Sequence, residues 1–326
     1  MQKKINIGSI GCANIAERYI LPTILEMPDM YRLVGTASRN SGKAEKFASK
    51  FNATPYADYR DLIGAEHLDA VYIPLPNQLH YEWIRKSLDH GLHVLVEKSL
   101  ACTGKEVVEL NQMAREKSLV LMENFQFRFH SQLQFIQDLL VQGVIGELRS
   151  VRSAFGFPPF PDKENIRYSK KLGGGALLDA GAYPIKISQL FLGEEISIDA
   201  ANLYFDKEKG VDIWGSAYLK QNSGPLASQI AFGFDNYYQC NLELWGSKGK
   251  LYTNRIFTAA PGFEPLVEVE TAAGRETLTL AQDHHFKKML GHFYQLIATG
   301  VGLDDEYRQN ITQARLINEL RLSAKA

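Results

Sequence analysis

Apolar and polar positions in roughly the first 125 residues alternate between two patterns. Short apolar runs typical of buried strands occupy residues 5–10, 33–37, 68–73, 93–96 and 120–122. Between them, apolar residues recur with helical spacing at residues 15–27, 44–51, 81–88 and 106–116. Pro22 lies inside the first of these stretches, so we expect a kink or break there. Repeated strand–helix units with short connections predict a doubly wound parallel sheet with helices on both faces.

After about residue 148 the pattern changes to the period-two alternation of exposed strands. Aromatic-rich runs at residues 197–205, 213–220, 229–234 and 238–245 are separated by turn-forming residues at 206–210, 222–224 and 246–249. These runs predict a mostly antiparallel sheet, and residues 304–326 predict a helix. A chain of 326 residues suits two hydrophobic cores. We therefore predict an α/β domain of residues 1–124 and an α+β domain of residues 125–326.

Charge and cysteine content exclude several classes of protein. The 36 Lys and Arg residues balance 37 Asp and Glu residues, which argues against nucleic acid or an anionic membrane as the main partner. The first residues lack the long apolar stretch of a secretory signal, and no run approaches the ~18 apolar residues of a membrane span. Cys12, Cys102 and Cys240 are widely scattered, which predicts a reducing, cytoplasmic location and no metal site.

The first strand ends in a glycine-containing loop with the sequence GCANIA at residues 11–16. It follows the dinucleotide fingerprint G-x-G-x-x-G/A, with alanine in the second and third slots. Gly11 permits a tight turn, and the following helix start presents free N–H groups to a pyrophosphate. A methyl group at residue 13 weakens the match. The expected cofactor contacts are Gly11, Cys12, Ala13, Asn14 and Ile15.

The loop after the second strand bears on which dinucleotide is bound. NAD-specific sites usually place Asp or Glu there to bind the ribose 2′-hydroxyl, and this loop has neither. Ser38, Arg39 and Lys43 instead offer a hydroxyl and two cations, which suits a 2′-phosphate. We predict that NADP(H) is preferred and that NAD(H) is possible. The alternative interpretation is a solvated basic loop that caps the next helix.

A lysine and a tyrosine are the main candidates for catalysis. Lys98 follows the strand at residues 93–96, and ligands of open parallel sheets bind outside the carboxyl ends of the strands. Residues 173–184 read GGGALLDAGAYP, in which Asp179 and Tyr183 are four apart and fall on one face of a helix. A free tyrosine, with a pKa of ~10, is a poor acid near neutrality. A nearby ammonium such as that of Lys98 lowers the pKa of a phenol. Without Lys98, an ordinary amphipathic helix would be the better interpretation.

Taken together, these motifs resemble the glucose–fructose oxidoreductase, inositol dehydrogenase and MocA (Gfo/Idh/MocA) family. The segments that carry the resemblance are GCANIA at 11–16, PNQLH at 76–80, HVLVEKS at 93–99, ENFQFRFHSQ at 123–132 and GGGALLDAGAY at 173–183. The resemblance implies a dinucleotide-binding Rossmann domain followed by an open-faced, mostly antiparallel sheet domain that binds substrate. It also implies a homodimer or homotetramer formed through that sheet.

The resemblance also assigns roles to residues. Lys98 matches the catalytic lysine of the family's EKP motif, and Asp179 and Tyr183 match its Asp and His/Tyr pair. Further cofactor contacts are implied at Pro74, Leu75, Asn77, His80, Glu97 and Lys98, and substrate contacts at Arg128, Asp179 and Tyr183. From the residues alone, His80 suits a hydrogen-bonding role at a helix start, and Arg128 suits either substrate binding or a structural tie. Ser99 replaces the family's usual proline, which relaxes the backbone restriction beside Lys98.

The predicted function is hydride transfer between NADP(H) and a keto-sugar or nucleotide-linked keto-sugar. Tyr183 would protonate the developing alkoxide, Lys98 would assist the phenol, and Asp179 would orient a neighbouring hydroxyl. The sequence most resembles NADP-dependent sugar 3-ketoreductases. Three alternatives remain: an aldose or trans-dihydrodiol dehydrogenase with the same site, an NAD-dependent glycosidase, and a non-catalytic dinucleotide-sensing regulator. The regulator is disfavoured because both Lys98 and Tyr183 are present.

Overall fold

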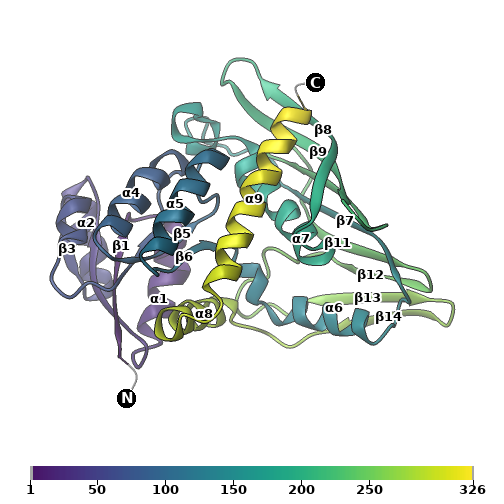
Figure 1. Ribbon diagram of the computed structural model, residues 1–326, viewed down its shortest axis with the longest axis horizontal. Helices are drawn as coiled ribbons and strands as arrows, with labels where there is room; N and C mark the ends of the chain where they lie inside the picture. Colours follow the sequence, from purple (N-terminus) through teal and green to yellow (C-terminus); the bar gives the residue numbers. More distant parts are fainter. Residues whose placement is uncertain (1–2, 325–326) are drawn as a thin grey trace. The chain divides into compact units, whose positions relative to one another are not determined.

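The computed structural model describes residues 3–324, which form two compact units (Figure 1). The first unit runs to Asn124 and includes Phe286–Ile311, and the second comprises Phe125–His285 and the segment from Thr312 onward. Residues 286–311 thus pack with the first unit, although they follow the second unit's strands in the sequence. Two buried hydrogen bonds hold them there. Tyr31 donates to the carbonyl of Leu290 at 2.7 Å, and Tyr307 donates to the carbonyl of Leu119 at 2.5 Å.

The first unit is built on a parallel sheet with the strand order β3-β2-β1-β4-β5-β6. This order confirms the predicted doubly wound Rossmann sheet: strands β2 and β3 extend it to one side of β1, and strands β4 to β6 extend it to the other. Its strands are β1 (Ile5–Ile10), β2 (Tyr31–Ala37), β3 (Thr54–Tyr56), β4 (Ala70–Ile73), β5 (His93–Glu97) and β6 (Leu121–Asn124).

The longer helices of this unit agree with the predicted ones, including the last, predicted at residues 304–326. The helices are α1 (Leu21–Leu25), α2 (Ser41–Phe51), α3 (Tyr59–Ile63), α4 (Asn77–Asp89), α5 (Gly104–Glu116), α8 (His285–Thr299) and α9 (Leu303–Ser323), which continues into the second unit. The exceptions are the short helices α1 and α3, and α8, which was not predicted. A π-helical turn at Ala16–Ile20 leads directly into α1, and Pro22 follows that turn. The irregular turn stands where a residue without an N–H interrupts the regular hydrogen-bond pattern.

The second unit contains an eight-stranded sheet with the order β14-β13-β12-β11-β7-β10-β9-β8. Its strands are β7 (Leu148–Gly156), β8 (Ile196–Asp206), β9 (Val211–Gln221), β10 (Ala227–Gly233), β11 (Gln239–Gly246), β12 (Gly249–Thr253), β13 (Leu266–Thr271) and β14 (Gly274–Thr279). All neighbouring pairs are antiparallel except β7 and β10, which confirms the predicted mostly antiparallel sheet. Two longer helices are α6 (Ser131–Val141) and α7 (Ala182–Leu192).

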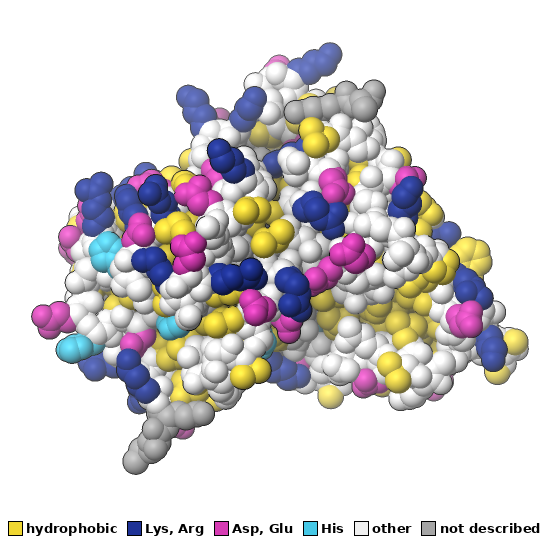
Figure 2. All heavy atoms as spheres, viewed as in Figure 1, with side chains coloured by type: hydrophobic (Ala, Val, Ile, Leu, Met, Phe, Trp, Pro, Cys, Tyr) yellow, Lys and Arg dark blue, Asp and Glu magenta, His cyan; other side chains and the backbone are white. Residues whose placement is uncertain are grey.

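The sheet of the second unit has one covered face and one exposed face. Along β9, Ile213, Ala217 and Leu219 are buried, while Trp214 and Tyr218 between them are exposed. Helix α7 packs against β7, β9 and β10 on the buried side. On the face of the molecule in Figure 2, basic and acidic side chains are interspersed without a large area of one sign. Within residues 3–324, no helix has the length and apolar character needed to cross a membrane.

Candidate functional site

The loop after β1 has the backbone that a dinucleotide-binding turn requires. Gly11 has a φ of +120°, and a Cβ atom there would lie 2.8 Å from Cδ2 of Leu75. Only glycine satisfies both conditions. Ala16 is fully buried at the start of the following π-helical turn, as expected for close packing of helix on strand. Ala13 is half-buried and Asn14 is exposed. The loop therefore fits a bound pyrophosphate at its exposed side.

The neighbouring thiol adds no negative charge to this loop. Cys12 is buried, and its Sγ lies 3.8 Å from the carbonyl oxygen of Ala37. Burial raises the pKa of the Cys12 thiol to about 11, and Lys43 only partly opposes this. A neutral thiol beside the turn leaves the helix-start N–H groups available to an anion.

In the basic loop after β2, the residue that caps the next helix is not one of the residues that carry positive charge. Asn40 is the residue that caps α2, because its Oδ1 accepts a hydrogen bond from the N–H of Lys43 at 2.9 Å. Ser38 is buried, and its Oγ accepts from the N–H of Asn40 at 3.2 Å. The side chains of Arg39 and Lys43 are exposed, so capping does not consume them. A hydrogen bond from Arg39 partly opposes the rise that burial causes in the pKa of Tyr59.

At the end of β5, neighbouring strands fix the backbone on both sides of Lys98. Oε1 of Glu97 accepts from the hydroxyl of Tyr72 at 2.6 Å and from Nδ2 of Asn124 at 2.7 Å. Two residues past Lys98, the N–H of Leu100 donates to Oε1 of the buried Glu123 at 2.8 Å. The peptide bond between Lys98 and Ser99 is cis. Lys98 itself is half-buried.

His80 joins the loop after β4 to the segment after β5. It is fully buried in α4, with Nδ1 at 2.7 Å from the carbonyl oxygen of Ser99 and Nε2 at 2.7 Å from that of Leu75. Burial lowers the pKa of His80 to about 4, the two carbonyl contacts oppose the shift, and the charge of Lys98 adds to it. The ring is thus neutral near pH 7 and donates to only one of the two carbonyls. Pro74 is buried in the same loop, and Asn77 is half-buried at the start of α4.

In the second unit, the triple glycine closes tightly on two other segments. The N–H of Gly175 donates to the carbonyl of Arg167 at 2.9 Å, and a Cβ at Gly174 would collide with that carbonyl oxygen. Gly175 has a φ of +117°, and a Cβ there would collide with the carboxylate of Asp212. Oδ2 of Asp212 accepts from the N–H of Leu177 at 2.5 Å, while burial raises the pKa of Asp212. The glycines thus bring the chain against its own backbone and against the half-buried Asp212.

Asp179 and Tyr183 lie in one continuous helical stretch, whose first turn is π-helical. Asp179 lies in a π-helical turn at Leu177–Gly181, and Tyr183 lies in the first turn of α7. The wider π-helical turn changes the angle between residues four apart. Asp179 is also bound by a residue that the sequence did not single out: Nε of Arg167 donates to Oδ2 of Asp179 at 2.5 Å.

Tyr183 lies in a cluster of phenylalanine rings. Its ring centroid is 5.6 Å from Phe125, 5.9 Å from Phe127, 5.1 Å from Phe155 and 5.5 Å from Phe257. Only 9% of Tyr183 is exposed. These rings fix the orientation of the phenol and exclude water from its sides.

Two cationic residues border this cluster. Lys186, one turn along α7, is 1% exposed, and its Nζ lies 5.2 Å from the centroid of Phe125. Arg128 is half-buried, with its guanidinium 5.3 Å from the ring of Phe129. The sequence did not indicate Arg167, Asp212 or Lys186, because their importance follows from contacts that no local motif encodes.

Comparison with known proteins gives the family. The model described as "Oxidoreductase family, NAD-binding Rossmann fold" matches residues 5–125, and the GFO/IDH/MocA C-terminal domain matches residues 133–252. The chain therefore belongs to the Gfo/Idh/MocA family, as the motifs predicted, and it is an NAD(P)-dependent oxidoreductase.

Several relatives match almost the whole chain. Two dTDP-3,4-didehydro-2,6-dideoxy-alpha-D-glucose 3-reductases are each 38% identical to it. The one from Saccharopolyspora spinosa covers 94% of this chain and 91% of its own, and the one from Actinomadura kijaniata covers 98% and 96%. A crystal structure of a 3-ketoreductase from Actinomadura kijaniata, in complex with NADP and TDP-benzene, matches with a TM-score of 0.94 at 37% identity over 98% of both chains. That ketoreductase has also been solved with one tyrosine changed to phenylalanine and with one lysine changed to alanine.

The neutral state of His80 predicts a specific dependence of stability on pH. The unfolded chain protonates this histidine below a pKa of ~6.5, whereas the folded chain resists protonation down to about 4. Falling pH therefore favours unfolding, by up to roughly 3 kcal/mol at this one residue. In His80→Gln this contribution is absent. The gap in unfolding free energy between wild type and variant should be widest above pH 6.5 and narrow towards pH 4.

Urea unfolding at several pH values measures this gap. Burial also lowers the pKa of His93 to about 4. His93 therefore makes a second contribution to the loss of stability at low pH, and both wild type and His80→Gln retain it. The double variant His80→Gln, His93→Gln should therefore show the weakest pH dependence of the three proteins. Parallel curves for wild type and His80→Gln would contradict the assignment of a neutral imidazole.

Proposed function

We propose that this chain reduces the keto group of a nucleotide-linked sugar, with NADPH as the hydride donor. The observation that carries the proposal is the phenol of Tyr183, which is set in an aromatic cluster and lies four residues after Asp179 in the same helical stretch. Two relatives matched over nearly the whole chain are named as 3-reductases of a dTDP-linked keto-sugar, which supports this substrate class.

The roles proposed for the side chains follow from their chemistry. The bound dinucleotide supplies the hydride. Tyr183 donates the proton to the oxygen of the reduced carbonyl, and the surrounding rings keep water from competing for that oxygen. Asp179, held by Arg167, orients a neighbouring sugar hydroxyl. Lys98 favours the phenolate that forms as the proton leaves, because a positive charge stabilises a developing negative one.

Removal of either catalytic group should abolish most of the turnover. With a dTDP-linked 3-keto-sugar and NADPH, Tyr183→Phe and Lys98→Ala should each lower kcat by roughly 10²–10⁴-fold, the range of general acid catalysis. The dissociation constant for NADPH in Tyr183→Phe should stay near that of wild type. The oxidation of NADPH, followed by its absorbance, measures turnover, and fluorescence measures binding.

Matched controls are available on the exposed face of the sheet. Tyr204→Phe and Lys220→Ala make the same chemical changes at exposed positions, and both should retain full activity. A parallel panel of free aldoses and dihydrodiols with NADP⁺ tests the dehydrogenase alternative. Cleavage of a glycoside without net change in the cofactor would favour the glycosidase. Near-normal turnover in both Tyr183→Phe and Lys98→Ala would refute the catalytic assignment.

We infer that NADP(H) is preferred because the exposed side chains of Arg39 and Lys43 suit a 2′-phosphate. Arg39→Ala should raise the dissociation constant for NADPH by about tenfold, as expected for the loss of one charge-assisted hydrogen bond. The value for NADH should change little. Titration with each dinucleotide checks this, with Lys46→Ala on the exposed side of α2 as the control. Tighter binding of NADH than of NADPH by wild type would overturn the inference.

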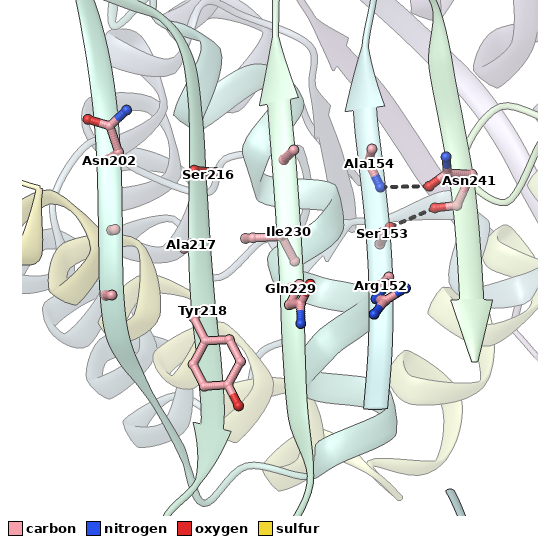
Figure 3. Close-up of a pocket in the computed structure, with 13 residues that line it drawn as sticks. Arg152, Ser153, Ala154, Asn202, Ser216, Ala217, Tyr218, Gln229, Ile230 and Asn241 are labelled. Atoms are coloured by element: carbon pink, nitrogen blue, oxygen red, sulfur yellow. Dashed lines mark hydrogen bonds between the residues drawn. The ribbon is translucent and has the colours of Figure 1, made fainter. Parts of the chain in front are cut away.

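We further propose that a second copy of the chain covers the exposed face of the sheet, giving a homodimer or homotetramer. Figure 3 shows β8, β9, β10, β7 and β11 side by side, with Asn202, Tyr218, Gln229 and Arg152 along them. These strands line a hollow of 640 Å³. Tyr204 and Trp214 stack at 5.1 Å at its margin and are 54% and 37% exposed. Exposed aromatic area of this kind on a regular sheet is typical of an interface.

The oligomer is tested by a charge placed in the hollow. Tyr218→Glu combined with Gln229→Glu puts two negative charges on adjacent strands, where self-association would bury them. Light scattering after gel filtration should show an oligomer for wild type and a monomer for the double variant. Thr277→Glu, exposed on β14 outside the hollow, is the control. A monomeric wild type at micromolar concentration would contradict the proposal.

A further inference from the structure

A second group of aromatic rings lies in the same unit as Tyr183 but is more open to solvent. Phe157, Phe160 and Tyr168 are half-buried, and Phe234 is buried beneath them. Phe160 lies 5.3 Å from Phe157, 5.8 Å from Phe234 and 6.1 Å from Tyr168. Phe157 also lies 5.6 Å from Phe155, which contacts Tyr183. The two clusters are therefore continuous.

Basic side chains flank these open rings. The guanidinium of Arg167 lies 4.8 Å from the centroid of Phe160, and Nζ of Lys209 lies 4.1 Å from that of Tyr168. Lys170 lies against Gly210, since a Cβ there would be 3.6 Å from Cδ of Lys170. The three cations come from two loops, residues 157–172 and 206–210.

The two loops are held in place by their own hydrogen bonds. Nζ of Lys209 donates to the carbonyl of Lys163 at 2.8 Å, and the N–H of Phe160 donates to the hydroxyl of Tyr168 at 3.0 Å. Acidic residues are also present, but some of their carboxylate oxygens accept hydrogen bonds from backbone N–H groups. Oδ1 of Asp206 accepts from the N–H groups of residues 208 and 209, and Oδ1 of Asp162 accepts from that of residue 164. The cations and rings are thus presented by a structured surface.

Arg167 connects this surface to the candidate site. Its Nε is bonded to Asp179, which leaves the two terminal nitrogens of the guanidinium, and these hydrogen-bond to no described residue. A guanidinium carries five N–H donors in a fixed fork, so one edge can hold Asp179 while the other holds a second anion. An anion bound to the terminal nitrogens would be separated only by the guanidinium of Arg167 from the carboxylate of Asp179, which we propose orients the sugar.

We propose that Phe157, Phe160, Tyr168, Arg167, Lys170 and Lys209 form a nucleotide-handle subsite that binds the nucleoside diphosphate of the substrate. The base stacks on the open rings, a contact that any base can make through its flat face. Arg167, Lys170 and Lys209 neutralise the diphosphate. The inference rests on the proposed function for the identity of the sugar donor, but nucleotide binding is measurable without turnover.

The diphosphate contacts are tested with dTDP as the probe. Calorimetric titration of the protein saturated with NADP⁺ should show dTDP binding. In the double variant Lys170→Gln, Lys209→Gln the dissociation constant should rise at least tenfold, with a smaller dependence on salt. Glutamine keeps a donor for the carbonyl of Lys163. The KM for the dTDP-linked keto-sugar should rise with little change in kcat. Lys220→Gln combined with Lys250→Gln removes the same charge from exposed positions on the sheet and should leave dTDP binding unchanged.

The stacking contact is tested separately by Phe160→Leu. This variant should bind dTDP at least tenfold more weakly, while its affinity for inorganic pyrophosphate stays near that of wild type. Thermal unfolding of each variant confirms that the loops remain folded.

The outcomes separate this inference from the proposed function. If wild type binds dTDP and the variants do not, but no keto-sugar is reduced, the subsite stands and the function fails. If wild type reduces the dTDP-linked sugar and the variants bind dTDP as wild type does, the subsite is wrong. Absence of dTDP binding by wild type would also overturn it.

Discussion

The neutral imidazole of His80 is the contact on which the geometry of the first unit's motif residues depends. Its two nitrogens face the carbonyl oxygens of Leu75 and Ser99, so one buried ring connects the loops that follow β4 and β5. Those loops carry the residues expected to meet the cofactor and the lysine expected to assist catalysis. A charged ring would satisfy both carbonyls, but burial and the nearby ammonium of Lys98 oppose the charge. The fold therefore fixes both loops through one neutral ring and places no second cation beside Lys98.

In the second unit, close contacts of the backbone hold the candidate site residues in place. The triple glycine lets the chain approach the carbonyl of Arg167 and the carboxylate of Asp212 more closely than any side chain would allow. Asp212 then binds the start of the π-helical turn that carries Asp179. Arg167 completes the arrangement by bonding Asp179 from the opposite end of the same loop. Asp212 thus holds the turn and Arg167 holds the carboxylate, so the orientation of Asp179 does not depend on a substrate being present.

The sequence predicted what local pattern encodes and missed what depends on distant contacts. Strands such as β4 and β5 have continuous apolar runs, and α2 and α5 have clear helical spacing. The Rossmann sheet could therefore be predicted from the sequence. Strand β7 was not, because LRSVRSAFG is too polar to stand out, although it lies in the middle of the second sheet. Helix α8 joins the first unit only through contacts such as that of Tyr31 with Leu290. Gly11, Ser38 and Tyr183 could be proposed from the sequence because their positions follow from a motif or from the end of a strand. Arg167 was missed because its partner is chosen by the fold.

The balance of charge along the chain hides how the charges are placed. A net charge of -1 argues against a polyanionic partner, yet Arg39 and Lys43 gather near one candidate phosphate position, and Arg167, Lys170 and Lys209 near another. Small anions need only two or three well-placed cations, whereas long polyanions need an extended basic surface. Local clusters within a neutral chain therefore suit a protein whose ligands each carry a few phosphates. The same reasoning explains why composition, which argues against nucleic acid as a partner, says nothing about nucleotides. Only the folding of separate loops onto one another brings those cations together.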